Sequence, residues 1–395
     1  MFRSLGLVLL LALAVPSLSG AAPFVPTDDA QVLERLPNKP GDPAARGLRD
    51  LRRRLAADPN NPAVATDLAE RYFRLAVREG DPRFVGYAQA ALTPWWKDRD
   101  PPVDVLVLRA GLTQYLHDFE AAIADLSLAL AREPDNLTAW SYRSVIYIVQ
   151  ARYDEARSDC RELVRRARTS LVANACEPTV DALTGHAESA YAALQQALSA
   201  YPRAPANERL WVLTRLGEIA HRLGRSAEAE AHFRTALGLG IHDAYLLATY
   251  AEFLLDAKRP QELVDLLKDH TRNDVLLLRL ALAEKALDLP AAKQRQAVVQ
   301  ARIDAARQRQ DKLHLSDEAL FELACLHHPR AAAQLARENW DLGQREPSDA
   351  RILLEAALAA RDPTIGRPAV EWLEGNRHED RKLLHLAQQL KAIEP

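Results

Sequence analysis

Apolar residues recur every three or four positions along most of the chain, in segments separated by short polar turns. This spacing predicts amphipathic helices. It is most regular in residues 103–170, which divide into two consecutive units, 103–136 and 137–170. Residues of similar type stand 34 positions apart in the two units: Ala110 and Ser144, Phe119 and Tyr153, Ala122 and Ala156, Leu126 and Cys160, and Ala129 and Leu163. Self-similarity at this period is typical of stacked helical hairpins, so the sequence predicts an all-α repeat fold.

The same register extends on both sides of these two units. Toward the C-terminus follow units at 171–204, 210–243 and about 244–277, and a divergent first unit covers 61–92. Pro178 falls inside the first helix of its unit. Because proline removes a helical hydrogen bond and clashes with the preceding turn, we expect a kink or a shortened helix there.

The residue types at fixed places in each unit resemble the tetratricopeptide repeat (TPR) family. Trp140, Ser144, Tyr147, Tyr153 and Ala156 stand at the signature spacings of that family. The resemblance implies a right-handed α-solenoid whose first helices line a concave groove. Because the groove binds partners in this family, the resemblance implies a non-catalytic scaffold or assembly factor that binds a partner protein or peptide.

The C-terminal part of the chain repeats with a different period. Ser316 recurs as Ser348 and Trp340 recurs as Trp372, in both cases 32 positions apart. We therefore expect two more helical hairpins, with each serine as the N-cap of a first helix. A final, more polar helix at 379–393 is expected to cap the apolar end of the last repeat.

Four regions are predicted along the chain. Residues 1–21 have the pattern of a cleaved signal peptide, because a basic residue precedes a short apolar run that ends in small residues; a short membrane anchor is the alternative. Residues 22–61 form a Pro-rich segment with a short helix. Residues 62–277 form the TPR solenoid of about six units, the first and fourth divergent. Residues 278–395 form the divergent helical hairpins and the capping helix, and they include a long polar helix at 290–313.

Composition narrows the cellular setting and the class of partner. Hydrophobic residues make up 48% and charged residues 27% of the chain, and the formal net charge is −3. Such a nearly neutral, slightly acidic chain argues against nucleic acid as the partner. After the signal peptide, no apolar run is long enough for a transmembrane segment. Abundant alanine and an excess of arginine over lysine are typical of a GC-rich bacterial genome, so the expected location is the periplasm.

The three cysteines give one candidate disulfide. In a TPR stack the second helix of one unit neighbours the first helix of the next, and Cys160 and Cys176 lie on two such helices. The resemblance therefore implies a disulfide between them, which a secreted setting permits; two buried thiols are the alternative. Cys325 is expected to be a buried free thiol.

Motifs of common enzymes are absent from the sequence, so no catalytic residue, cofactor or metal site is predicted. We find no phosphate-binding glycine loop, no His-Glu-x-x-His, no Cys-x-x-Cys and no Gly-x-Ser-x-Gly. His327 and His328 are adjacent, and adjacent side chains on a helix point about 100° apart, so they do not predict a metal site. The alternative class is a cell-envelope enzyme that needs only two carboxylates, for which Glu218 and Glu252 are the first candidates.

The family's groove positions, carried over unit by unit, give the candidate partner-binding residues. They are Glu70, Arg74, Gln114, Tyr115, Thr138, Ser141, Trp211, Glu218, His221, Arg222, Tyr245 and Glu252. Trp95 and Trp96 are a further candidate contact, because aromatic residues are enriched at interfaces; the alternative is that they cap the core between the first two units. A third functional class is binding of peptidoglycan or another glycan through Trp95, Trp96, Trp211 and Tyr245.

Overall fold

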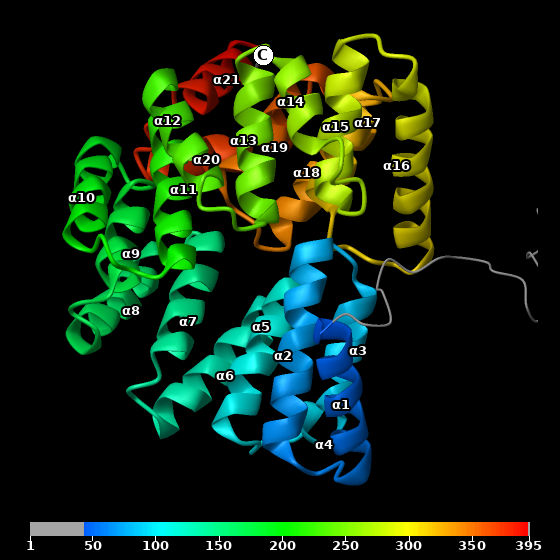
Figure 1. The fold of residues 1–395 in the computed structure, drawn as a ribbon. Coiled ribbons are helices and arrows are strands. Elements are labelled where there is room, and N and C mark those ends of the chain that lie inside the picture. The colour runs from blue at the N-terminus through cyan, green and yellow to red at the C-terminus, as the bar shows by residue number, and fades with distance from the viewer. Residues whose placement is uncertain (1–42, 394–395) are drawn as a thin grey trace, which may run out of the picture. The chain divides into compact units, whose positions relative to one another are not determined.

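The computed structural model describes residues 43–393, and all regular secondary structure in this range is helical (Figure 1). No strand occurs among these residues, which confirms the all-α prediction. The predicted signal peptide and most of the Pro-rich segment lie outside the described residues. The helices are α1 (Pro43–Ala57), α2 (Pro62–Glu79), α3 (Arg83–Ala91), α4 (Thr93–Trp96), α5 (Val103–Tyr115), α6 (Phe119–Arg132), α7 (Leu137–Val149), α8 (Tyr153–Arg166), α9 (Leu171–Asp181), α10 (Ala187–Ala200), α11 (Ala206–Arg222), α12 (Ser226–Leu237), α13 (Ala244–Asp256), α14 (Pro260–Leu267), α15 (Asp274–Ala286), α16 (Ala291–Gln308), α17 (Leu315–Ala324), α18 (Pro329–Asp341), α19 (Pro347–Ala360), α20 (Pro363–Gly375) and α21 (Arg381–Ala392).

From α2 onward the helices form pairs that stack as a solenoid. The pairs are α2/α3, α5/α6, α7/α8, α9/α10, α11/α12, α13/α14, α15/α16, α17/α18 and α19/α20, and α21 follows as the last helix. Helix α9, which contains Pro178, spans 11 residues, whereas α5 and α7 span 13 residues each, so the expected shortening is present. Pairing continues through α15/α16 without a break, so a boundary between 62–277 and 278–395 stays a prediction. No helix within residues 43–393 has both the length and the apolar character needed to cross a bilayer.

Polar side chains fix the start of most first helices. Asn61, Asn136, Ser170, Asp243 and Asn273 each precede a first helix, and the side-chain oxygen of each accepts the N–H of the residue three positions later. Such caps satisfy one of the N–H groups that a helix leaves without an internal partner. The capping residues therefore set where each first helix begins, and so which of its side chains face the concave side.

The N-caps predicted for the C-terminal hairpins are wrong. Ser316 and Ser348 each lie inside a helix, while the caps are His314 for α17 and Glu346 for α19. Glu346 and Asp349 form a capping box, in which each side chain accepts the backbone N–H of the other. Because this box satisfies two backbone donors at once, α19 begins at Pro347 and includes the serine.

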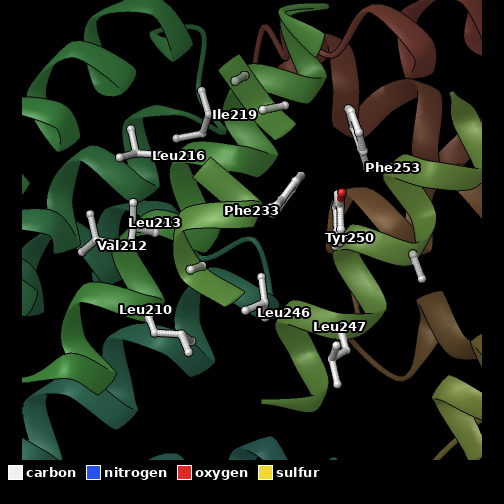
Figure 2. Packing of buried hydrophobic residues seen from close by; sticks show 14 of the residues in the cluster. Leu210, Val212, Leu213, Leu216, Ile219, Phe233, Leu246, Leu247, Tyr250 and Phe253 are labelled. Carbon is white, nitrogen blue, oxygen red and sulfur yellow. The ribbon is translucent and has the colours of Figure 1, made fainter. Parts of the chain in front are cut away.

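An apolar core runs through the described helices from α9 to α15, and Figure 2 shows its part between α11, α12 and α13. Phe233 of α12 is fully buried there, and its ring centroid lies 5.5 Å from that of Tyr250 and 5.8 Å from that of Phe253. Gly217 on α11 leaves the space that the ring occupies, because a Cβ at this glycine would lie 2.5 Å from Cε1 of Phe233. The aromatic ring and the glycine together let the three helices approach closely.

The long polar helix α16 packs against the solenoid. Its Arg295 binds Glu284 of α15 at 2.8 Å, and its Arg307 binds Glu318 of α17 at 2.6 Å. Val299 is the buried residue in the middle of its apolar stripe. The helix therefore covers the α15 and α17 side of the stack through ion pairs on its polar face.

A disulfide joins Cys160 of α8 to Cys176 of α9, which confirms the predicted pairing. Cys325 is a buried free thiol, as expected. We expect reduction, or replacement of both Cys160 and Cys176 by serine, to lower the free energy of unfolding by about 3 kcal/mol, because the bond closes a short loop of the unfolded chain. Urea unfolding with and without reductant measures the difference. Cys325→Ser serves as the control, and a reductant that has no effect on wild type contradicts the prediction.

The C-terminal helices return to the turns that join the first helical pairs, which the sequence did not predict. Gln344 lies 2.8 Å from Nδ1 of His117, and the N–H of Arg345 donates to the carbonyl of Val149 at 2.9 Å. Farther along, the carboxylate of Glu379 accepts the N–H of Ala187 at the start of α10. In Figure 1, α19, α20 and α21 accordingly lie behind α11 and α13. The solenoid therefore closes on itself. We call the helices from α2 to α14 its first turn and those from α17 to α21 its second turn.

Candidate functional site

The return of the C-terminal helices encloses a cavity of about 770 Å³ on the concave side of the solenoid. Of the predicted partner-binding residues, Gln114, Tyr115, Glu218, His221, Arg222, Tyr245 and Glu252 line this cavity. The other wall comes from the loop before α19 and from α19 and α21. The first helices α11 and α13 thus present their concave faces to the chain's own C-terminal part.

One wall of the cavity is a linked group of three side chains from α11 and α13. The hydroxyl of Tyr245 donates to Glu218 at 2.6 Å, and Glu218 pairs with Arg215 at 3.0 Å. The guanidinium of Arg215 also lies over the ring of Tyr245, 4.5 Å from its centroid. Tyr245 exposes 43% of its surface, and that surface faces the cavity. The cavity walls desolvate the hydroxyl of Tyr245 and raise its pKa well above the ordinary value, so the hydroxyl stays a hydrogen-bond donor.

A second group joins three successive first helices. Arg279 of α15 donates to Glu252 of α13 and to Asp317 of α17, each at 2.7 Å. Burial opposes the charge of Arg279, but Asp317 and Glu252 more than offset this and raise its pKa. Glu218 and Glu252, the carboxylates considered as an acid–base pair, are therefore each paired with an arginine of the chain itself.

A third group connects the two turns of the solenoid at Asp256, the last residue of α13. Asp256 accepts from Arg351 of α19 at 2.8 and 3.0 Å and from Lys382 of α21 at 2.6 Å. Its carboxylate also lies 3.0 Å from Nε2 of His221 on α11. Burial favours the neutral acid, but His221, Arg351 and Lys382 together lower the pKa of Asp256. The carboxylate is therefore charged and holds groups from three other helices.

Two acids at the start of α19, half-buried Glu346 and buried Asp349, line the cavity. Burial, followed by the neighbouring charge of Asp349, raises the pKa of Glu346 to about 7. Burial likewise raises the pKa of Asp349 to about 6. Arg215 and Arg222 act in the opposite direction on Glu346 but do not cancel the effect of burial.

We expect this raised pKa to make stability fall with increasing pH. Because folded Glu346 keeps its proton between pH 4.5 and about 7 while the unfolded residue loses it, the free energy of unfolding falls through this window and levels above it. The contribution is at most about 3 kcal/mol. Melting temperatures of Glu346→Gln and wild type across this range measure it, with the exposed Glu371→Gln as control. Identical pH profiles for wild type and Glu346→Gln contradict the prediction.

The concave face of α2, α5 and α7 carries a group of aromatic and aliphatic side chains, which we call the aromatic groove. It consists of Phe73, Tyr115 and Tyr142, whose rings lie around Gly111 or meet one another, together with Val77 and Val145, which lie four and three positions after Phe73 and Tyr142 and so on the same helix faces. The rings of Phe73 and Tyr115 meet edge to face at 5.8 Å. Val77 is 47% exposed and Val145 36% exposed. This face therefore presents apolar surface that the folded chain leaves partly open.

A glycine sets the depth of the aromatic groove. A Cβ at Gly111 of α5 would lie 3.3 Å from the rings of both Phe73 and Tyr142, so a larger residue would push the two rings apart. Glu70 and Arg74 are exposed, pair with each other at 3.3 Å and act electrostatically on Tyr142. These two predicted residues therefore form a charged rim beside the groove.

The remaining predicted residues lie apart from the cavity lining. Thr138 is exposed and Ser141 half-buried on α7, while Trp211 is half-buried against the core of α11. Trp95 and Trp96 are half-buried on the short helix α4, and Arg109 Nη1 donates to their carbonyls at 2.7 and 3.1 Å. The partner-binding role of all these residues stays a prediction.

The adjacent histidines each have a partner within the chain. Nδ1 of His328 lies 2.9 Å from Glu322, and Nε2 of His327 lies 3.1 Å from Nζ of Lys285. Within residues 43–393, no group of three or more histidine, cysteine or acidic side chains has the arrangement of a metal site.

Sequence reasoning missed Asp256, Arg351 and Lys382, and it did not select Tyr142. The first three are isolated charges without a motif, and the contacts of Asp256 with Arg351 and Lys382 span 95 and 126 positions. Tyr142 could have been selected from the sequence, because it directly follows the groove position Ser141. Its ring lies beside Gly111, a small residue in the first helix of the preceding repeat.

Comparisons with known proteins identify one repeat type. The family model described as tetratricopeptide repeat matches residues 212–239, which lie in α11 and α12 and the turn that follows. A comparison with the curated proteins gave no match.

Several solved structures are similar to parts of the chain. One is a tetratricopeptide repeat protein from Parabacteroides merdae, with a TM-score of 0.48 and 18% identity over 61% of this chain and 92% of that chain. Another is PilW, described as a type IV pilus biogenesis factor, with a TM-score of 0.40 and 20% identity over 51% and 94%. A third is TTC0263, a thermophilic TPR protein of Thermus thermophilus, with a TM-score of 0.39 and 22% identity over 47% and 99%.

Proposed function

We propose, on the premise that this chain is a tetratricopeptide repeat protein, that it is a scaffold or assembly factor of the bacterial periplasm. It binds a segment of a partner protein, or a peptide, on the aromatic groove of α2, α5 and α7. The observation that carries the proposal is the group of rings of Phe73, Tyr115 and Tyr142 on neighbouring first helices, with the exposed Val77 and Val145 on the same helix faces.

The chemistry of the aromatic groove indicates what kind of segment it fits. Aromatic rings bury a large area with little loss of conformational freedom, so they are frequent among the residues that dominate binding energy. The rim charges Glu70 and Arg74 already pair with each other. The fitting segment therefore has apolar anchor side chains, with polar residues where it passes the rim.

The proposed location follows from two features. The disulfide between Cys160 and Cys176 is typical of an oxidising compartment, such as the bacterial periplasm. The sequence pattern of residues 1–21 is that of a secretion signal, and it lies outside the described residues.

Affinity capture from periplasmic extract tests the proposal, followed by titration of the captured protein against wild type and variants. Tyr142→Ala is expected to weaken binding by roughly tenfold or more, because it removes a ring from the centre of the groove. Tyr87→Ala is the matched control, since Tyr87 is 52% exposed on the second helix α3. Equal binding by Tyr142→Ala and wild type would place the site elsewhere.

A further inference from the structure

The contact between the C-terminal helices and the first turn of the solenoid is narrow and mainly polar. The apolar cluster of α17 to α21 is separate from the clusters of the earlier helices. Among the described residues before α15, Ala151 alone packs against that cluster. Hydrophobic burial therefore stabilises the packing of helices within each turn, and it contributes little to the contact between the two turns.

The strongest polar contact between the turns is the group around Asp256. Arg351 binds the carboxylate through two nitrogens, at 2.8 and 3.0 Å, and Lys382 binds it at 2.6 Å. Two-point arginine–carboxylate pairs are among the strongest and most directional hydrogen bonds in proteins. One side chain of α13 thus fixes the positions of both α19 and α21.

Glu355 on α19 is a second carboxylate partner of both Arg351 and Lys382. It accepts from Nε of Arg351 at 2.9 Å and lies 3.6 Å from Lys382. Because Glu355 stays with the C-terminal helices, Arg351 and Lys382 keep one carboxylate partner if the turns separate. Separation therefore does not leave either cation buried without a partner, which keeps the open arrangement accessible.

The rest of the contact is imperfectly satisfied. Nε2 of His378 is buried without a hydrogen-bond partner, whereas the hydroxyl of Tyr153 interacts with the side chain of Trp372 across the contact. His378 follows α20 and is only 3% exposed. A buried polar group without a partner is destabilising, and opening would return Nε2 of His378 to water. The closed contact is therefore held by a few charged groups against an opposing polar cost.

We infer that Asp256, Arg351 and Lys382 form a latch that holds the second turn of the solenoid closed over the cavity. With the latch closed, the concave faces of α11 and α13 are covered by the chain itself. Glu218, Arg222 and Tyr245 already line one cavity with Val77 and Tyr115 of the aromatic groove, and with the latch open this shared surface becomes accessible to a longer segment. This inference rests on the proposed function only for its consequence, namely that the latch controls how much of the concave face a partner reaches.

Two backbone amides report directly on the closed contact. The N–H of Ala187, in the first turn of α10, donates to Glu379, and the N–H of Arg345 donates to the carbonyl of Val149. The first N–H groups of a helix have no partner inside the helix, so Ala187 is protected only while Glu379 stays in place. Hydrogen exchange at these two amides therefore measures opening without any partner protein.

The test compares hydrogen exchange in the full chain of wild type, Asp256→Asn and the milder Lys382→Met. We expect exchange at Ala187 and Arg345 to become at least about tenfold faster in Asp256→Asn, and to a smaller extent in Lys382→Met. Exchange in the middle of α5 and α6 is expected to stay unchanged. Glu338→Gln is the matched control, because Glu338 pairs with Lys312 at 2.6 Å entirely within the C-terminal part.

Two results would overturn the latch. One is unchanged exchange at Ala187 and Arg345 in both variants, which would show that other contacts hold the turns. The other is faster exchange throughout the chain in both variants, which would show that Asp256 maintains the fold as a whole. Neither result depends on partner binding. The latch can therefore be refuted by hydrogen exchange while Tyr142→Ala still abolishes partner capture, and the binding proposal can be refuted while the latch is confirmed.

Discussion

Phe233→Ala is expected to lower the free energy of unfolding by about 3–5 kcal/mol, among the largest effects of any single substitution in this chain. The side chain is fully buried at the centre of the core between α11, α12 and α13. Its removal leaves a cavity bounded by Tyr250, Phe253 and the backbone at Gly217, and paired helices cannot collapse far enough to fill it.

Urea unfolding followed by circular dichroism measures the effect of Phe233→Ala. Phe84→Ala is the control, because Phe84 is a half-buried ring on α3 in the first helical pair, so its removal leaves no fully enclosed cavity. The two variants should differ clearly, with Phe84→Ala the more stable. A Phe233→Ala protein as stable as Phe84→Ala would contradict the packing described for this core.

Arg279→Met is expected to destabilise the fold by about 3–5 kcal/mol, because it leaves Glu252 and Asp317 without their shared cation in a buried site. Methionine keeps the apolar stem of the side chain, so the loss reports on the charge. In wild type, Arg279 and His314 hold the pKa of Asp317 well below its usual range. That stabilisation is present above the ordinary pKa of aspartate and is lost as pH falls toward the lowered value.

Two measurements separate the charge effect of Arg279 from a general packing effect. The deficit of Arg279→Met should be largest near neutral pH and should shrink in acid, where its unpaired acids become neutral. Adding Asp317→Asn to Arg279→Met should recover part of the loss, since it removes one unpaired charge. A deficit that is independent of pH and unchanged in the double variant would show that the ion pairs are not its cause.

The local structure was predictable because it depends on short-range patterns. The 34-residue register placed the helical pairs, and Pro178 correctly indicated a shortened first helix. The Cys160–Cys176 disulfide followed from the neighbouring helices that the family resemblance implied. Exact helix starts were less predictable: at Ser348, capping by Glu346 and Asp349 competes with capping by serine, and α17 begins before Ser316, after His314.

The closure of the solenoid was not predictable from the same patterns. Whether a second turn meets the first depends on small rotations between successive helical pairs, which add up over the whole stack. A repeat signature specifies each pair and its neighbour, and it says nothing about residues 95 or 126 positions apart, such as those that meet at Asp256. The groove positions themselves therefore do not reveal that the C-terminal helices α19 and α21 form part of the wall opposite Glu218 and Tyr245.

The most direct test of the closed solenoid is zero-length carbodiimide cross-linking of the wild-type protein, with mass spectrometry of the linked peptides. The reagent joins a lysine amine to a carboxylate only when the two are in contact. A link between Lys382 and Asp256, which lie 2.6 Å apart, is expected alongside the internal control link between Lys312 and Glu338, also at 2.6 Å. Recovery of the control link without a Lys382–Asp256 link would contradict the claim that the C-terminal helices close over the first turn of the solenoid.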